Sequence, residues 1–543
     1  MVQNNLLFQI HPSQCALFNG TVWTVNSAQP WAEAVAIRGE KVLEVGSSKE
    51  LKKMIGSNTQ CIDLKGALVL PGFIDSHTHF LNGGFALSSI QLRDVTNRKE
   101  FIARIAEKAK NLGQGEWILN GDWDQQKFDI PELPRKEWID SITPYNPVCL
   151  NRLDSHMVFV NSLALKKAGI TKYTSCPSGG ELLKDPVSGE LTGILKDAAI
   201  SLVKQHIPEP NLKDKIKAAE AALQHAKEKG VTSVHDMGCT ANFEVYQKLL
   251  KENKLTARIY VYMPISEMEM YSRLKLKAPF GNNFLKIGGL KGFVDGSLGS
   301  STALFFKPYI DNAENKGLLA SDMFPEGIME KRIMEADEAG LQVAVHAIGD
   351  EANHIILDIM QKVMTGNVYK DRRWRIEHAQ HLIPEDIERI AVIKIIASVQ
   401  PYHLIDDGLW AEGKIGQERV RYSYAFKSLR EKGAVLACGS DWTVAPLDPI
   451  TGIYAAVTRQ TLDGKNPRGW IPEQKISLEE AIKGYTLSGA YAEFSENIKG
   501  SLERGKLADL VVLSQNLFKI PPEEIMETEV KMTVFNGEII YKK

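Results

Sequence analysis

The sequence PGFIDSHTHF, residues 71–80, is the stretch that decides the fold. It is a short apolar run that ends in His77 and His79. Side chains two positions apart on a β-strand point to the same face, so both imidazoles face one way at the end of the strand. Two such imidazoles make half of a metal site. Taken alone, the motif is equally consistent with two surface or core histidines at a strand end.

Seven further apolar segments follow along the chain, each with a helical pattern after it. They span residues 230–238, 257–264, 284–295, 341–350, 373–380, 395–401 and 434–442. Intervening stretches such as 216–230 and 324–340 carry apolar residues at three- and four-residue spacing and end in glycine, which is typical of amphipathic helices. Eight strand–helix units predict an α/β fold, a closed (β/α)8 barrel of the TIM type.

Three more metal-ligand residues end predicted strands. His346 ends the fifth strand, His378 the sixth and Asp441 the eighth. Barrel enzymes place their catalytic groups at the carboxyl ends of the strands. Five such residues from four strands would therefore meet at one mouth, which argues against unrelated core histidines.

Lys291 is a polar residue inside the apolar fourth strand. A buried lysine is costly unless it is neutralised, paired or modified. A lowered pKa would free the amine to react with carbon dioxide, and the resulting carbamate would bridge two cations. Two alternatives stay open: an ion pair with Asp295, or a side chain that extends outward to solvent. Lys286 competes for the same role but lies nearer the start of the strand.

The two ends of the chain have the same β character. Residues 1–70 and 499–543 both contain short alternating runs joined by Asn-Gly and similar turns, so we expect them to form one composite β-sandwich domain. The barrel then spans residues 71–498. The gap between its first two strands is too long for one crossover, and it predicts an inserted lid-like subdomain at about residues 81–215.

Composition excludes several classes of protein. The 65 Lys and Arg nearly cancel the 67 Asp and Glu among 543 residues, so no overall field would collect nucleic acid or an anionic membrane. The chain shows no secretory signal and no apolar stretch of membrane-spanning length, and we expect a cytoplasmic protein. Six dispersed cysteines predict neither a disulfide framework nor a zinc ribbon. A homodimer is the default expectation for a soluble enzyme.

These motifs resemble one family in order and spacing. Besides the strands above, RLDSHMVFVNSLAL (152–165), LKGFVDGSLGSSTALF (290–305) and KGSLERGKLADLVVL (499–513) are similar to the metal-dependent amidohydrolases, in particular to the family 3 branch that contains N-substituted formamide deformylase. The resemblance covers nearly the whole chain.

The resemblance implies a metal centre and a reaction. His77 and His79 would hold one cation, His346 and His378 a second, and a carboxylated Lys291 would bridge them, with Asp441 contacting the metal and shuttling the proton. Zinc, as one or two ions, is the expected cation, although iron, manganese, cobalt and nickel also suit these ligands. The expected activity is hydrolysis of carbon–nitrogen bonds other than peptide bonds in N-formyl, amide or cyclic amide substrates, through a metal-activated hydroxide.

A second group of residues is predicted to bind the small-molecule substrate: His156, Asp295, His403, His235 and Trp123. His156 is similar to a family position that faces the pocket. For His235 and His403 the alternative is a role in satisfying hydrogen bonds around the site, and for Trp123 a structural one. Two other functions stay open: an esterase or phosphoesterase at the same metal centre, or a catalytically silent regulatory protein on this fold.

Overall fold

The computed structural model describes residues 13–238, 240–365 and 370–543. Its central sheet contains eight parallel strands in chain order. They are β8 (Phe73–Thr78), β14 (Val231–Asp236), β15 (Arg258–Pro264), β17 (Leu285–Phe293), β18 (Gln342–Ala347), β19 (Arg375–His378), β20 (Ile396–Val399) and β21 (Leu436–Cys438). A parallel bridge between Thr78 and Trp442 joins the last strand region to the first. All eight predicted strands are present, and the sheet is a nearly closed TIM-like barrel.

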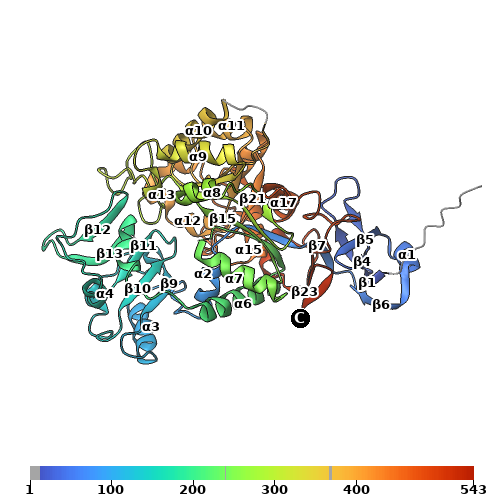
Figure 1. Cartoon of the computed structure of the whole chain (residues 1–543), viewed down its shortest axis with the longest axis horizontal. Helices are drawn as coiled ribbons and strands as arrows, with labels where there is room; N and C mark the ends of the chain where they lie inside the picture. The colour runs from blue at the N-terminus through green and yellow to red at the C-terminus, as the bar shows by residue number, and fades with distance from the viewer. Residues whose placement is uncertain (1–12, 239, 366–369) are drawn as a thin grey trace, which may run out of the picture.

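Helices surround this barrel (Figure 1). The main ones are α6 (Leu212–Glu228), α7 (Thr240–Lys251), α9 (Ile328–Ala339), α10 (Asp350–Thr365), α11 (Pro384–Val392) and α15 (Pro449–Thr458). Their ends follow the sequence: the Asn211 side chain accepts a hydrogen bond from the backbone of Asp214 to start α6, and Gly340 ends α9 in the left-handed conformation at φ 75°. One large apolar core fills the space between helices and strands.

Strands from both ends of the chain share one sheet. The six-stranded sheet has the order β24 (Glu538–Lys542), β23 (Val530–Phe535), β22 (Leu510–Leu513), β7 (Leu68–Pro71), β2 (Thr21–Trp23) and β3 (Trp31–Ala32). A four-stranded sheet lies beside it, in the order β5 (Lys41–Gly46), β4 (Ala34–Arg38), β1 (Ser13–Phe18) and β6 (Ile55–Asp63). Side chains from both sheets pack in one core, for example Leu17, Val69 and Val534.

A five-stranded sheet lies in the segment between β8 and β14, on the opposite side of the barrel from the terminal sheets (Figure 1). Its order is β12 (Gly180–Lys184), β13 (Leu191–Asp197), β11 (Met157–Val160), β10 (Val148–Arg152) and β9 (Ile118–Trp123), and α3 (Arg98–Lys110) precedes it. This sheet has apolar cores of its own. Loops at its end reach the mouth of the barrel.

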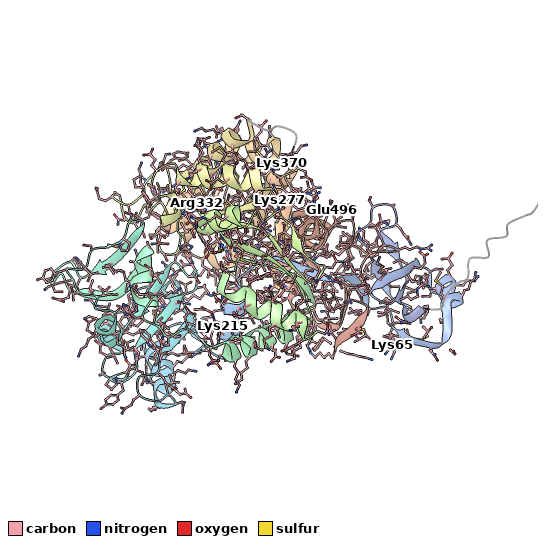
Figure 2. All side chains as sticks on the ribbon, viewed as in Figure 1. Lys65, Lys215, Lys277, Arg332, Lys370 and Glu496 are labelled. Atoms are coloured by element: carbon pink, nitrogen blue, oxygen red, sulfur yellow. The ribbon has the colours of Figure 1, made fainter. Side chains whose placement is uncertain are left out.

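Figure 2 shows the side chains on the ribbon, with charged residues such as Lys65, Lys277 and Arg332 labelled. Among the described helices, none has the length and apolarity needed to cross a bilayer. Five cysteines are free thiols, and Cys239 lies outside the described residues.

Candidate metal centre

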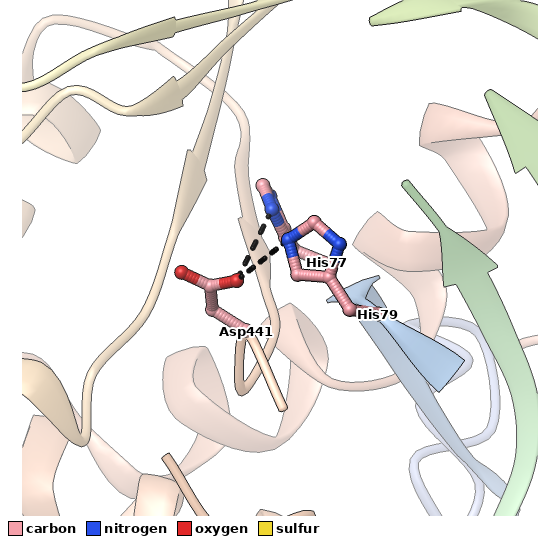
Figure 3. A group of neighbouring side chains, drawn as sticks. All are labelled: His77, His79 and Asp441. Atoms are coloured by element: carbon pink, nitrogen blue, oxygen red, sulfur yellow. Dashed lines mark ion pairs between the residues drawn. The ribbon is translucent and has the colours of Figure 1, made fainter. Parts of the chain in front are cut away.

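His77, His79 and Asp441 lie together at the mouth of the barrel (Figure 3). His77 is on β8, His79 follows it, and Asp441 follows β21. The Oδ1 atom of Asp441 lies 3.5 Å from Nε2 of His77 and 3.4 Å from Nε2 of His79. The three side chains offer one ligand atom each within 4.8 Å of one another, which is the spacing of a metal site.

A second such set shares Asp441 and adds His378 and His403. His346 lies beside it, with its ring centroid 4.5 Å from that of His378. Two backbone angles here fall in the left-handed region, at His378 (φ 76°) and Asp441 (φ 57°). Such angles are strained for residues with a side chain, and they gather at functional sites.

Lys291 completes the group from β17. Its side chain is 4% exposed, and its Nζ lies 4.7 Å from the ring centroid of Phe293. Burial lowers the pKa of this lysine to about 8, although Glu377 and Asp441 act in the opposite direction. With this pKa, a fraction of Lys291 carries a neutral amine near neutral pH.

The two alternatives for Lys291 and the competing Lys286 do not fit the structure. Asp295 does not pair with Lys291, because its carboxylate accepts hydrogen bonds from the backbone amides of three residues, Ile348, Gly349 and Leu304. A buried Lys291 does not extend to solvent. Lys286 lies at the opposite end of the strand, where its Nζ donates to Ser495 Oγ at 3.1 Å.

Four buried polar atoms around this mouth lack a hydrogen-bond partner among the described residues. They are Lys291 Nζ, His346 Nδ1, His403 Nε2 and Asp441 Oδ1. Buried polar groups in proteins are nearly always satisfied, so a cluster of unsatisfied ones points to a missing partner. Nitrogen and oxygen donors converging from separate strands are what a divalent cation requires, and the residues therefore fit a metal.

The protonation states suit the same partner. Burial lowers the pKa of His77 to about 4 and lowers those of His346 and His378 as well. These imidazoles are therefore neutral at pH 7, as metal ligands must be. Burial by itself would raise the pKa of Asp441, but the neighbouring His77 and His79 hold it below its usual range, so this side chain is a carboxylate.

A cavity of about 190 Å³ contains this centre. Of the residues predicted to bind substrate, His156 and His403 line it. His156 reaches it from the loop between β10 and β11, and its ring centroid is 5.0 Å from that of His346. Its Nδ1 lies 2.6 Å from Oδ1 of Asp197. Burial would lower the pKa of His156, but Asp197 raises it above the ordinary value.

The other three predicted substrate residues lie away from the cavity wall. Asp295 is fully buried and organises the backbone of neighbouring loops, as described above. His235 is fully buried inside the barrel, where its Nδ1 accepts from Arg375 Nη1 at 2.8 Å. Trp123 packs in the core of the inserted sheet and donates from Nε1 to the Leu150 carbonyl at 3.0 Å, which is the structural alternative.

Several residues of the site were not predicted from sequence. Arg152 is buried in the cavity wall and pairs with Asp124 at 2.5 Å and Asp154 at 2.6 Å. Glu377 accepts from Nδ1 of His77 at 2.5 Å. The only sequence signal for Glu377 was its place beside His378 at the end of a predicted strand.

Comparison with known proteins identifies the family. The sequence profile of the amidohydrolase family matches residues 60–541. The chain belongs to the amidohydrolase family. The resemblance inferred from the motifs is thereby confirmed.

Relatives within the family are similar over nearly their whole length. Protein LONG AFTER FAR-RED 3 of Arabidopsis thaliana is 42% identical over 536 residues, which cover 96% of this chain and 91% of that protein. N-substituted formamide deformylase of Arthrobacter pascens is 26% identical, with 97% and 98% covered. The crystal structure of an uncharacterized metal-dependent hydrolase from Pyrococcus furiosus is 31% identical, with 93% and 100% covered and a TM-score of 0.72.

Proposed function

We propose that this amidohydrolase-family chain hydrolyses carbon–nitrogen bonds other than peptide bonds, in substrates such as N-formyl compounds, amides or cyclic amides. The observation that carries the proposal is the set of four unsatisfied buried polar atoms around one cavity, beside His77 and His79. Support also comes from the relative whose name states hydrolysis of an N-substituted formamide.

His77, His79, His346, His378, Lys291 and Asp441 would hold the metal, one or two ions, with zinc expected and with Lys291 as the carbamate. A bound divalent cation supplies Lewis acidity, which lowers the pKa of water and polarises a carbonyl oxygen. Asp441 is the proton carrier: as a carboxylate at the cavity wall it accepts the proton of the attacking water. The same carboxyl group then returns that proton to the leaving nitrogen.

His156 and His403 bind the substrate from the cavity wall in this proposal. The hydrogen bond from Nδ1 of His156 to Asp197 leaves Nε2 to face the substrate. The inserted segment, about residues 81–215, would act as the lid that positions His156 and limits entry of water. The proposal also divides the chain into two domains: a β-sandwich domain built from both chain ends, and a barrel that carries this insertion.

The test is metal analysis of the purified protein, followed by a screen of N-formylamines, lactams, hydantoins and esters with added zinc or manganese. The proposal predicts stoichiometric metal, turnover of at least one amide-type substrate, and loss of both in His77→Ala. Turnover of esters alone would replace the proposal by an esterase. Metal without turnover of any compound would favour a catalytically silent protein.

A further inference from the structure

Arg375 lies at the centre of the barrel, beneath the metal-binding side chains. It is fully buried, and its guanidinium binds groups from five strands. The acceptors are Ser76 O, His235 Nδ1, Tyr262 OH, the Glu377 carboxylate and Ser398 Oγ. A planar guanidinium with every donor used has little freedom to move. Arg375 therefore restricts the movement of the groups that it binds.

Glu377 links Arg375 to the metal centre. Oε1 of Glu377 accepts from Arg375 Nε at 2.7 Å, and Oε2 accepts from Arg375 Nη2 at 2.9 Å. The same Oε2 atom lies 2.5 Å from Nδ1 of His77. Both Glu377 oxygens thus accept from the Arg375 guanidinium, which can only donate, so the group binds as a carboxylate.

A carboxylate only accepts hydrogen bonds, so His77 must carry its proton on Nδ1. The other ring nitrogen, Nε2, then presents its lone pair to the cavity, where it lies 3.5 Å from Asp441 Oδ1. The tautomer of His77 and the direction of its ring are thus both set by Glu377. Partners of this kind are known to orient metal-binding histidines.

We propose that Glu377 is a positioning residue of the metal centre: it keeps Nε2 of His77 unprotonated and directed at the cation, and Arg375 keeps Glu377 in place. The inference rests on the proposed function, because it requires His77 to bind a metal. The competing explanation is that Glu377 serves only to neutralise the buried Arg375. The two explanations predict different metal affinities.

Glu377→Gln separates them because an amide has one oxygen where the carboxylate has two. If that oxygen faces Arg375, the amide NH2 faces His77 Nδ1 and favours the tautomer with the proton on Nε2, which cannot bind a cation. If the amide is turned over, its NH2 group faces the guanidinium of Arg375, and two groups that only donate hydrogen bonds face each other. We expect the dissociation constant for Zn²⁺ alone, measured by competition with a chromophoric chelator, to rise by about 10–100-fold.

Glu493→Gln is the matched control. Glu493 is a buried carboxylate at the barrel too, 2.5 Å from Lys499 Nζ, but it faces Lys499 and His235 rather than His77. The same substitution there also leaves a buried cation without its partner. We expect it to lower the denaturant midpoint of unfolding and to leave the Zn²⁺ affinity within about twofold of wild type.

Glu377→Asp covers the case in which Glu377→Gln fails to fold. It keeps the negative charge beside Arg375 and withdraws the carboxylate from His77 by one methylene, so we expect a folded protein with weaker Zn²⁺ binding. Wild-type Zn²⁺ affinity in the folded Glu377 variants would overturn the inference and leave the proposed function standing. Failure of the wild type itself to bind Zn²⁺ would overturn both.

Discussion

Nδ1 of His156 and Oδ1 of Asp197 lie 2.6 Å apart, and this pair is where the inserted segment meets the histidines of the barrel. Asp197 ends β13 with φ 46°, in the left-handed region that residues with side chains rarely adopt. Gly296 lies against this pair: a Cβ there would clash with the Thr302 side chain and would come within 2.9 Å of Asp197 Oδ1. The contact therefore lies in a closely packed part of the site.

Asp197→Asn is expected to impair catalysis without removing the metal. The neutral amide weakens a charge-assisted hydrogen bond worth about 1.5–3 kcal/mol, which corresponds to a loss of about 10–100-fold in kcat/KM. Steady-state kinetics on an amide substrate measure the loss, and metal analysis provides the control. Unchanged kcat/KM would show that the orientation of His156 is irrelevant to the reaction.

Asp441→Asn is expected to retain metal and to lose turnover. The histidines remain as ligands, but the amide cannot carry the proton from water to the leaving nitrogen, and such transfer contributes about 10²–10⁴-fold to rate. Single-turnover rates together with metal content test this. A variant with normal turnover would remove Asp441 from the proposed mechanism.

Stability is expected to fall as the pH drops from 7 to 5, and His381 contributes to this. Burial, with a smaller effect of Arg419, lowers the pKa of His381 to about 3 in the folded protein, against an ordinary value of 6.5. Below pH 6.5 the unfolded chain therefore binds a proton that the folded chain does not, and the difference amounts to about 2 kcal/mol at pH 5.

His381→Gln should reduce the pH dependence of stability by that amount. Urea unfolding of wild type and variant at pH 7 and pH 5 gives the four free energies needed. His381 hydrogen-bonds to Ser423 Oγ through Nδ1 at 2.6 Å, so the variant also loses some stability at pH 7, and only the difference between the two pH values is informative. Equal slopes in both proteins would contradict the assignment.

Asp509→Ala is expected to destabilise the whole protein. Asp509 precedes β22, and its carboxylate accepts from Nε and Nη2 of Arg258 on β15 at 2.7 and 3.0 Å. Removal of one partner from a buried ion pair costs about 3–5 kcal/mol. Asn536→Gly removes a 3.1 Å contact with the same guanidinium and tolerates the positive φ of 52° at this position. It is the control and should cost about 1 kcal/mol in denaturant unfolding.

The barrel and the metal-binding residues at its mouth could be predicted from the sequence, because the carboxyl ends of parallel strands lie on one side of the barrel. Hydrophobic runs located the eight strands, and residues at their carboxyl ends, such as His77 and Asp441, had to meet. The depth of a side chain was harder to predict. His235 occupies the same place near the end of β14 as His77 does on β8, yet it binds Arg375 inside the barrel.

The pairing of these two strands is irregular. Their register shifts twice, between Val231 and Ser233 and again between Val234 and Asp236. Such shifts change the depth and direction of a side chain and leave no trace in hydrophobic periodicity. Three further residues of the site could not be predicted because each pairs with a side chain distant in the sequence: Asp197, Arg152 and Glu377.

The antiparallel pair of β7 and β22 joins residue 71 to residue 510 and residue 68 to residue 513. During synthesis on the ribosome, β7 emerges before any strand of the barrel, and its partner emerges after all eight. A barrel that forms before synthesis is complete would therefore leave one side of β7 without its partner strand. Ribosome-bound chains that stop short of residue 510 would expose this strand to chaperones, and release of the full chain would cover it.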